Sequence, residues 1–422
     1  MGIEAFRKWI NVFYTDNFSA KAFVSHSTNV KKEALEQIDL LPKIKNKLFL
    51  TPELSPTFSK KDDDLVEILG IMTRILDGHG YESDTGAHGH RGYNEPMMFV
   101  WIGAAVDIPF KVHKLLGTLG PKLYFLRLPS ISKSEDYYIN DLDKDFAEKI
   151  ARVNVALFEF LNLFEIGPDL HLDEKSGIKK MEWDALNPKN EARTKLFIVR
   201  LGILLAHLRG VIPTFHTDES NSQGLGYSYT LATIEDPRRA MTQLRNLARG
   251  HALSQSRNYM TMDDIPLIIK VVFSTASMER VRIFELLIEH KGRLTTSLIT
   301  KSLNTSNNTA KRTMAEFHAL GLVDLGDIKS QHGEPEKEIT LKDEFRWFLS
   351  DEFNTVRKNT PVSDDVNDDV NENYDDETIA EAIELASTTS IDPAKYICPN
   401  CNQEQYKNCT NLHKNSCKGR LY

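Results

Sequence analysis

Residues 236–265 read DPRRAMTQLRNLARGHALSQSRNYMTMDDI, and this stretch predicts two consecutive helices. Asp236 and Pro237 are a typical helix start, because aspartate caps free N–H groups and proline tolerates the first helical position. Apolar residues then recur at the spacing of one buried helix face. A second start, Asp263-Asp264, precedes the apolar run Ile265 to Phe273. We therefore expect a pair of packed helices here.

The sequence before this stretch also has the spacing of amphipathic helices. Asp145 to Leu163 and Asn190 to Leu208 each place apolar residues on one face at a period close to that of an α-helix. From about Asp141 to Ala276 we therefore expect an almost entirely helical region. Residues 140–275 are assigned to an all-α domain on this basis.

The first part of the chain differs, because short apolar runs bounded by turn residues alternate with amphipathic stretches. Such alternation is typical of an α/β sheet. A glycine-rich segment, Asp77 to Tyr93, predicts a hairpin or a loop. Residues 1–130 are therefore assigned to an α/β core. We expect strands at Ala22–Ser25, Lys47–Thr51, Met98–Ile102 and Leu123–Leu128, and helices at Asp64–Leu76 and Lys111–Leu119.

Residues 276–345 have an order of elements of their own. Three short amphipathic stretches predict helices, and Gly321 ends the last of them. Two short apolar runs that follow can pair as a two-stranded wing. Three helices and a hairpin are the outline of a winged helix-turn-helix. The expected helices are Glu279–His290, Leu294–Leu303 and Asn308–Leu320, and the expected strands are Leu322–Leu325 and Glu338–Leu341.

Acidic residues are concentrated in one segment of the 422-residue chain. The formal net charge is −8, but Asn359 to Ala394 alone contain eleven Asp or Glu and no Lys or Arg. Without that segment the charge is near +3 (−8 plus 11), so the folded regions are close to neutral or weakly basic. The polar, aromatic-poor composition predicts a flexible linker over residues 350–393, with Thr378 to Leu385 as a candidate short helix.

All four cysteines lie in the last 25 residues, and their spacing predicts a metal site within residues 394–422. Cys398 and Cys401 form a CxxC pair, and His413 and Cys417 follow one helical turn apart. Two such pairs supply the closed tetrahedral set that a structural Zn²⁺ takes. Cys409, four residues before His413, is the alternative fourth ligand.

Residues 47–54, KLFLTPEL, and the helical stretch from Arg239 to Ile265 resemble the AAA+ ATPases, nearest to the clade of minichromosome-maintenance helicases and magnesium chelatase. In that family a strand ends in acidic residues that hold Mg²⁺ and polarise the attacking water. The resemblance implies that Glu53 is the catalytic carboxylate. Pro52 stands where the family usually has Asp, which weakens the implied metal binding. Phe99 to Ala105 takes the place of the first sensor but offers no obvious polar residue.

The same resemblance, which covers roughly residues 20–345, implies roles for four arginines. Arg239 opens the helix that closes the family's lid and would be the second-sensor arginine, with Arg238 as the fallback. Such an arginine contacts the γ-phosphate and stabilises the charge that develops during phosphoryl transfer. Arg91 and Arg127 would be candidate fingers acting on a neighbouring subunit, which implies a homo- or hetero-oligomeric ring. The alternative for each is a structural arginine paired with a carboxylate.

The sequence contains no phosphate-binding loop of the form GxxxxGK[ST]. The segment Gly117 to Lys122 is superficially similar, but a predicted helix precedes it and Leu123 follows its lysine. We therefore expect ATP and Mg²⁺ to bind only if upstream sequence or a partner supplies such a loop. Alone, the chain is expected to hydrolyse ATP poorly or not at all.

The third predicted helix of residues 276–345 would enter the DNA major groove by its N-terminal end. Asn and Arg can read adenine and guanine edges, and Lys favours phosphate. The alternative is a winged helix that serves protein contacts. The residues expected to contact DNA are Asn307, Asn308, Thr309, Lys311 and Arg312.

The composition adds limits on the class of protein. Apolar residues make up 41% and charged residues 27%, as in ordinary globular proteins. The most apolar stretch, Leu196 to Leu208, is interrupted by Arg200, and the N-terminus lacks the apolar core of a signal peptide. We therefore expect a cytoplasmic protein without membrane association.

These observations predict an α/β partial AAA+ core followed by an all-α lid, a winged helix-turn-helix and a small zinc-binding tail. The corresponding function is a DNA-associated, helicase-like ATPase fragment or subunit that depends on a phosphate loop from elsewhere. The alternative is a non-enzymatic DNA-binding regulator built on a degenerate ATPase scaffold. A third interpretation is a replication-helicase fragment from a split or mis-started gene.

Overall fold

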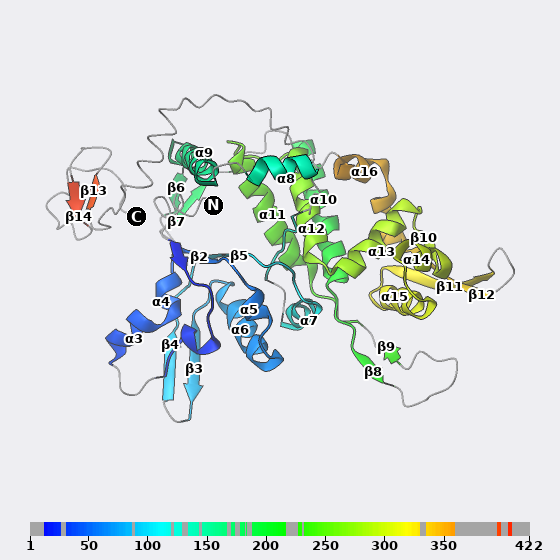
Figure 1. Cartoon of the computed structure of the whole chain (residues 1–422), viewed down its shortest axis with the longest axis horizontal. Helices are drawn as coiled ribbons and strands as arrows, with labels where there is room; N and C mark the ends of the chain where they lie inside the picture. The colour runs from blue at the N-terminus through cyan, green and yellow to red at the C-terminus, as the bar shows by residue number, and fades with distance from the viewer. Residues whose placement is uncertain are drawn as a thin grey trace. The chain divides into compact units, whose positions relative to one another are not determined.

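The computed structural model separates the chain into two compact units (Figure 1). One consists of Met1–Trp9, Lys133–Asn162 and Asn367–Tyr422, and the other of Ile10–Ser132 and Leu163–Val366. The described residues are 12–26, 31–86, 89–119, 122–128, 134–142, 146–166, 170–173, 178–181, 183, 188–216, 227–229, 232–329, 335–358, 395–397 and 404–406. The fold is mixed α/β, with long helices and several small sheets.

The larger unit begins with a three-stranded parallel sheet. β1 (Val12–Tyr14), β2 (Leu48–Thr51) and β5 (Val100–Gly103) lie in the order β1-β2-β5. β2 and β5 confirm the strands predicted at 47–51 and 98–102. The glycine-rich segment forms the predicted hairpin, with β3 (Tyr81–Thr85) antiparallel to β4 (Gly89–Tyr93).

Aromatic side chains fill the core on this sheet. Phe49 of β2 is fully buried and lies between Phe13 and Trp101 in the strand register. Its ring stacks on Trp101 with centroids 5.9 Å apart, and Phe18 makes an edge contact with the same tryptophan. Such a cluster buries a large apolar area with few side-chain degrees of freedom, so it fixes the register of the sheet.

Helices cover the sheet through two clusters of buried apolar residues. α6 (Asp62–Ile75) contributes to both clusters and confirms the helix predicted at 64–76. It packs with α2 (Ala20–Phe23) and α4 (Leu40–Ile44) in one cluster, and with α5 (Ser55–Phe58) and α7 (Phe110–Leu119) in the other. α3 (Lys32–Ile38) packs on α4.

Two strand predictions for this region are wrong. Residues 20–23 form a helical turn, α2, whose Phe23 is fully buried, instead of the strand predicted at Ala22–Ser25. Residues 122–128 form no strand in the described structure, although Leu123–Leu128 was predicted as one. Short apolar runs do not distinguish a buried strand from any other buried segment, and here tertiary contacts decide the conformation.

Three long helices form the centre of the larger unit, and Figure 1 shows them side by side. They are α10 (Pro188–Leu208), α11 (Pro237–Ser254) and α12 (Ile265–Thr275). Asp236 caps α11 as predicted, with its carboxylate accepting the backbone N–H of Arg238. The expectation of an almost entirely helical region is wrong in one respect, because the hairpins β6–β7 (Leu170–Asp173, Ile178–Met181) and β8–β9 (Thr214–His216, Tyr227–Tyr229) interrupt it.

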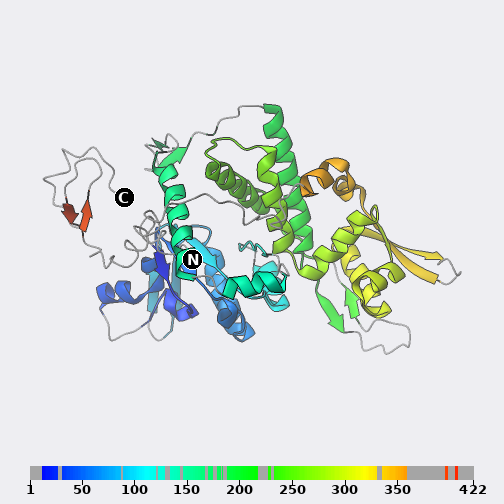
Figure 2. The ribbon, with the colours of Figure 1, turned by 45° about the horizontal axis from the view of Figure 1, so that its top comes forward.

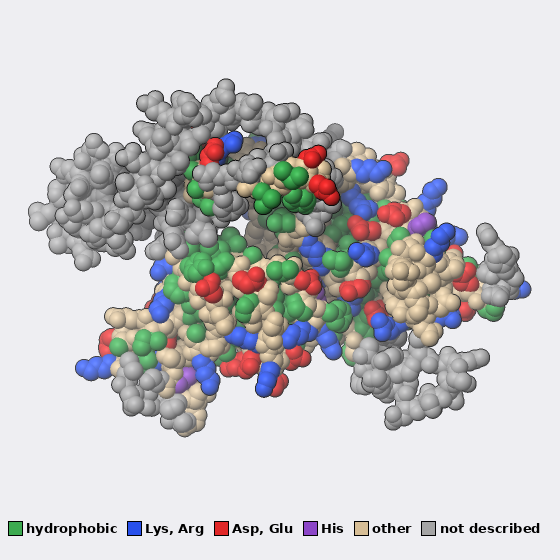
Figure 3. Space-filling view, in the orientation of Figure 1, with side chains coloured by type: hydrophobic (Ala, Val, Ile, Leu, Met, Phe, Trp, Pro, Cys, Tyr) green, Lys and Arg blue, Asp and Glu red, His purple; other side chains and the backbone are tan. Residues whose placement is uncertain are grey.

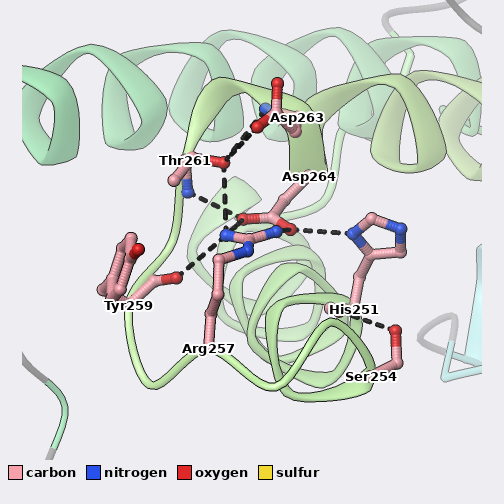
Figure 4. A network of polar contacts seen from close by, with 7 residues as sticks. All are labelled: His251, Ser254, Arg257, Tyr259, Thr261, Asp263 and Asp264. Carbon is pink, nitrogen blue, oxygen red and sulfur yellow. Dashed lines mark hydrogen bonds and ion pairs between the residues drawn. The ribbon is translucent and has the colours of Figure 1, made fainter.

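A buried carboxylate joins α11 to α12 (Figure 4). Asp264 is fully buried and accepts hydrogen bonds from Arg257 at 2.8 Å, His251 at 2.7 Å and the backbone N–H of Thr261 at 2.7 Å. Arg257 also donates to the carbonyl of Tyr259. The network fixes the turn between the helices, since each member restrains the next.

The C-terminal part of the larger unit follows the predicted order of elements. α13 (Met278–Glu289), α14 (Thr296–Leu303) and α15 (Asn307–Ala319) confirm the three helices, and Gly321 adopts a left-handed φ of 75° after α15. β11 (Val323–Lys329) and β12 (Pro335–Leu341) are longer than predicted, and β10 (Arg293–Thr295) adds a third antiparallel strand. Figure 2 shows the β11–β12 ribbon projecting beyond α14 and α15.

The same apolar core continues from α10–α12 into these elements. A 3₁₀ helix (Asp343–Leu349) and α16 (Asp351–Lys358) pack back on it, and Arg200 of α10 lies 4.4 Å from the centroid of the Trp347 ring. Phe353 of α16 is fully buried. The first residues of the predicted linker, 350–393, therefore belong to the fold, while Thr378–Leu385 lies outside the described residues.

The smaller unit contains α8 (Glu135–Leu142), most of α9 (Phe146–Ile166) and a hairpin of β13 (Lys395–Ile397) and β14 (Glu404–Tyr406). α9 confirms the helix predicted at 145–163. Residues 133–162 group with the C-terminal segment in this unit.

Segment 122–128 is attached to the end of α12. The backbone N–H of Phe125 donates to Thr275 Oγ1 at 3.0 Å, and Arg127 donates to the carbonyl of Ala276 at 3.1 Å. His113 of α7 packs against the Phe125 ring in an edge contact. Burial lowers the pKa of His113 to about 4, and the charge of Arg127 acts in the same direction.

Substitution of Asp264 tests the network between α11 and α12. Asp264→Ala should lower the free energy of unfolding by about 3–5 kcal/mol, because it leaves the Arg257 charge without its buried partner. Asp263→Ala removes an exposed neighbouring carboxylate and should cost about 1 kcal/mol or less. Urea unfolding followed by circular dichroism measures both. Equal losses would show that the network does not stabilise the fold.

The buried imidazole predicts a pH dependence. His113 has a pKa of about 4 in the fold against an ordinary 6.5, so between these values the unfolded chain binds more protons. The free energy of unfolding should therefore fall as pH drops from 6.5 to 4, by about 2 kcal/mol after allowance for partial exposure. His113→Gln should remove this component from urea midpoints measured across that range. An unchanged pH profile in the variant would contradict the assignment.

Candidate nucleotide and DNA sites

Glu53 lies at the carboxyl end of the parallel sheet, directly after β2. Its carboxylate accepts the backbone N–H of Ser55 at 2.8 Å, and hydrogen bonds from Ser55 hold its pKa below the usual value. The side chain is half-buried. Glu53 is thus ionised at neutral pH and fixed at the start of α5, where the ends of parallel strands commonly form ligand sites.

The chain after β5 runs beside the Glu53 loop. The N–H of Ala104 donates to the carbonyl of Thr51 at 3.1 Å, and the N–H of Leu54 donates to the carbonyl of Ala104 at 2.6 Å. The strand assigned to the first sensor is therefore adjacent to Glu53. Its nearest following carboxylate, Asp107, is exposed.

Arg238 and Arg239 lie in the first turn of α11, and both are exposed. Arg238 pairs with its own N-cap, Asp236, at 2.8 Å from Nε, and this contact lowers the pKa of Asp236 to about 2. Burial raises the pKa of Glu235, and the charges of Arg209 and Arg239 oppose that rise. Of the two, Arg239 is the arginine whose guanidinium is not engaged by the helix cap.

Arg91 and Arg127, the two candidate fingers, are both engaged within the fold. Arg91 of β4 is 18% exposed and pairs with the fully buried Asp39 at 2.9 Å. Tyr93 donates to the same carboxylate at 2.8 Å. Burial lowers the pKa of Arg127, which caps the end of α12 at Ala276. These contacts are those of structural arginines, the alternative stated for each.

The structure does not bring these residues together into one site. No hydrogen bond or ion pair joins Glu53 to any of the four arginines in the described part of the chain. The residues predicted to act on nucleotide are therefore not joined by direct contacts within the described part of the chain.

The five residues predicted to contact DNA lie in the first two turns of α15. Ser306 caps the helix by accepting the N–H of Thr309. Asn307, Asn308, Lys311 and Arg312 are exposed, and Thr309 is half-buried. On the opposite face Met314, Phe317 and Leu320 are buried against the core. The N-terminal end of α15 thus presents polar and basic side chains on a rigidly packed helix.

Arg280 does not contribute to this surface. It donates to the carbonyls of Leu208 and Gly210 at 2.8 and 2.7 Å and is partly buried. The β11–β12 ribbon is not basic either, since Asp324, Asp327, Glu336 and Glu338 outnumber Lys329 and Lys337. Figure 3 shows basic and acidic side chains interspersed over the α13–α15 part.

The four predicted zinc ligands, Cys398, Cys401, His413 and Cys417, and the alternative Cys409, lie outside the described residues. The backbone on both sides of the CxxC segment is described. β13 and β14 pair so that Ile397 is opposite Glu404, which brings the two ends of this segment together. Elsewhere in the described chain, no group of three or more His, Cys, Asp or Glu is placed to hold a metal ion.

Sequence reasoning missed the network around Asp264. The Asp263-Asp264 pair was predicted only as a helix start, and its partnership with Arg257 and His251 was not predicted. The sequence contains only a weak signal for this network, because His251, Arg257 and Asp264 come from a helix end, a turn and a helix start. Only the fold shows that their side chains meet.

The sequence matches no protein-family model and no curated protein. None of the described helices combines the length and the apolarity needed to cross a lipid bilayer. The proposals below therefore rest on the residues and their geometry.

Proposed function

We propose that this protein binds DNA through the N-terminal end of α15 and carries an AAA+-type, helicase-like ATPase scaffold that depends on a phosphate loop from upstream sequence or a partner. The observation that carries the DNA proposal is the exposed polar end of α15, held on a small helical domain with a three-stranded sheet. A non-enzymatic DNA-binding regulator is the second candidate.

The domain that contains α15 supports a winged helix-turn-helix interpretation. α13, β10, α14, α15 and the β11–β12 hairpin follow one another in the order of that motif. α14 and α15 pack on each other, and Asn304 adopts a left-handed φ of 50° in the turn between them. In such domains the second helix of the pair enters the major groove. α15 occupies that position.

The side chains at the N-terminal end of α15 are suited to contact both the bases and the phosphates of DNA. Asn308 can accept and donate at an adenine edge, Arg312 can pair with guanine, and Lys311 can neutralise a phosphate. The acidic balance of the β11–β12 ribbon makes this hairpin a poor phosphate contact. The binding surface is therefore centred on the helix and not on the wing.

The ATPase part of the proposal is supported by the position of Glu53. An ionised carboxylate at the end of a central parallel strand is suited to orient water or a metal-bound phosphate. Arg239 is exposed at the start of α11, where a guanidinium can reach an anion. Catalysis would still need backbone N–H groups around the phosphates, which a glycine-rich loop before a helix supplies.

The outer edge of the sheet, at β5, is where that loop's strand would pair. β5 pairs with β2 alone within the described residues, and Val100 and Ile102 are 60% and 49% exposed. Parallel sheets are normally covered on both faces, and exposed apolar edges attract further strands. A strand that docks beside β5 would carry its following loop to the end of the sheet where Glu53 lies.

The second candidate function, a non-enzymatic DNA-binding regulator, is favoured by the contacts of Arg91 and Arg127. Both guanidinium groups are committed to partners inside the fold, so neither is poised for a neighbouring nucleotide. A ring of subunits would then be an assembly scaffold without turnover. Insensitivity of DNA binding to ATP would support this alternative.

Zinc is proposed as a structural ion held by Cys398, Cys401, His413 and Cys417. The paired ends of the CxxC segment support a knuckle between β13 and β14, the turn on which such pairs usually sit. Four protein ligands close the coordination shell, so the ion would stabilise the tail and take no part in turnover.

Glu53→Gln tests the ATPase scaffold. Turnover by an ATPase complex purified with this chain from its native cells should be lost, because the carboxylate can no longer polarise water. Glu67→Gln, an exposed carboxylate on α6, is the matched control and should leave turnover unchanged. Equal activity of the Glu53 variant and the wild type would remove Glu53 from the site.

Lys311→Ala tests the DNA surface. Affinity for duplex DNA should fall to a similar extent for all sequences, and the slope of log affinity against log salt should decrease by about one. Lys358→Ala, an equal charge change on exposed α16, should leave both unchanged. Fluorescence anisotropy titrations at several salt concentrations measure these values. Unaltered binding of the Lys311 variant would indicate a protein-contact role for the domain.

Cys398→Ser tests the zinc site. The full chain should contain about one Zn²⁺ per molecule, and the variant should contain almost none, since a three-ligand site holds the metal weakly. Elemental mass spectrometry of the purified proteins gives the ratio. Cys409→Ser should retain the metal if His413 and Cys417 complete the set. Full zinc content in the Cys398 variant would contradict the assignment.

A further inference from the structure

A cavity of about 300 Å³ lies within the larger unit, beneath α15. α7, segment 123–125, the end of α10, the α12–α13 junction and α15 all contribute to its lining. Glu53 and Arg239 are not among the lining residues, so this space is distinct from the candidate nucleotide site. Its volume is at the lower end of the range for small-molecule sites.

Cations outnumber anions around this cavity. Lys114, Arg209, Arg280 and Arg312 line it, against the single carboxylate of Glu316. Burial raises the pKa of Glu316, and the charges of Arg280 and Arg312 oppose that rise. Burial lowers the pKa of Arg280, and the charges of Glu316 and Glu279 oppose that fall. The field inside the cavity therefore favours an anion.

Two buried donors at the cavity have no hydrogen-bond partner among the described residues. Arg209 is 7% exposed and holds Glu235 through Nε and Nη2, but its Nη1 is unpaired. Ser277 is 6% exposed, and its Oγ is unpaired although it stands at the N-cap of α13. Buried donors without partners are costly, so a polar ligand that these side chains reached after a small rotation would relieve that cost.

The remaining walls are apolar and partly aromatic. Leu116 is buried, Phe125 packs against His113, and Phe110 is 61% exposed. His113 is held neutral by burial, so it adds a flat, largely apolar surface and no charge. A bare inorganic anion would leave these walls uncovered. An organic body with a flat face would cover them.

We propose that this cavity binds a small organic phosphate of the nucleotide class. The phosphate would lie among Arg209, Ser277 and Lys114, and the flat body would lie against Phe110 and Phe125. A phosphate accepts several charge-assisted hydrogen bonds, which suits the remaining guanidinium nitrogen of Arg209, the Ser277 hydroxyl and the Lys114 ammonium group. The cavity would then hold a regulatory ligand, separate from any nucleotide that is turned over.

Arg312 connects this cavity to the DNA surface. It lines the cavity, lies 3.9 Å from Glu316 and is half exposed on the same face of α15 that is proposed to contact DNA. Because Arg312 also lines the cavity, the phosphate would contact its guanidinium as well, and a base edge outside the cavity would compete for it. Ligand binding should therefore weaken DNA binding, and DNA should weaken ligand binding by the same factor. This linkage rests on the proposed DNA-binding function, whereas the ligand site itself does not.

Calorimetric titration of the full chain with adenosine monophosphate, without DNA, tests the site. We expect saturable binding at one site per chain, with adenosine and inorganic phosphate each at least tenfold weaker. Lys114→Gln and Ser277→Ala should each reduce the affinity about tenfold. Lys111→Gln, on the same helix but bonded to the carbonyl of Lys60, is the matched control and should bind as the wild type does. Thermal melts confirm that the variants are folded.

Several outcomes would overturn the proposal. Absence of saturable binding would exclude a nucleotide-class ligand, and adenosine as tight as the monophosphate would exclude the anion subsite. Inorganic phosphate as tight as the monophosphate would exclude the organic body. Equal affinities of all four proteins would place the ligand elsewhere. If DNA fails to bind at all, the proposed function fails while the titration still decides the cavity.

Discussion

The fold depends on one buried carboxylate. Asp264 is enclosed at the start of α12 and collects donors from the end of α11 and from the turn between the helices. An ionised group in this position is tolerated only because Arg257 and the backbone satisfy it. The orientation of α12 relative to α11 follows from this contact. The two helices form the framework on which both ends of the larger unit are built.

α12 then connects the other parts of that unit. Thr275 and Ala276 at its end hold segment 122–128, which follows the α/β sheet, and α13 begins two residues later. The apolar core runs without interruption from α10–α12 into α15 and the β11–β12 ribbon. A displacement of α12 would therefore reach both the sheet region and α15. The cavity beneath α15 lies where these connections converge.

The arginine side chains have several different structural roles in this fold. Arg257 and Arg91 neutralise buried carboxylates, Arg280 and Arg127 hold carbonyl groups, and Arg238 is taken by a helix cap. Arg239 and Arg312 keep exposed guanidinium groups. Guanidinium groups that are already paired cannot reorganise cheaply toward a ligand. Arg239 and Arg312 are therefore suited to contact nucleic acid or nucleotide at the surface, whereas Arg209 is proposed to do so within the cavity beneath α15.

Sequence patterns predicted the long elements well and the short ones poorly. The cap at Asp236, the glycine hairpin and the three helices before β11 follow from local rules, since capping, turn geometry and a wide apolar face act within a few residues. Ala22–Ser25 and Leu123–Leu128 were assigned to strands because their apolar runs are too short to show a period. Their conformation depends on partners far along the chain, Phe49 and Thr275 among them.

The site residues likewise fall into two groups, those that local sequence rules predict and those that depend on distant contacts. The exposed end of α15 could be predicted, because a helix with one apolar face must present the other to solvent. The cavity could not, because Arg209, Ser277 and Lys114 come from three separate elements and no motif links them. The pairing of Arg91 with Asp39 was equally hidden, since 52 residues separate them.

The most direct test of this account is ultraviolet cross-linking of the full chain to duplex DNA, followed by mass spectrometry of the attached peptides. If α15 is the DNA-reading helix, the cross-linked peptides should be concentrated in residues 307–312, with few in the β11–β12 ribbon. Cross-links that concentrate in the ribbon, or in the sheet region around Glu53, would contradict the account, as would the absence of any cross-link under low-salt conditions.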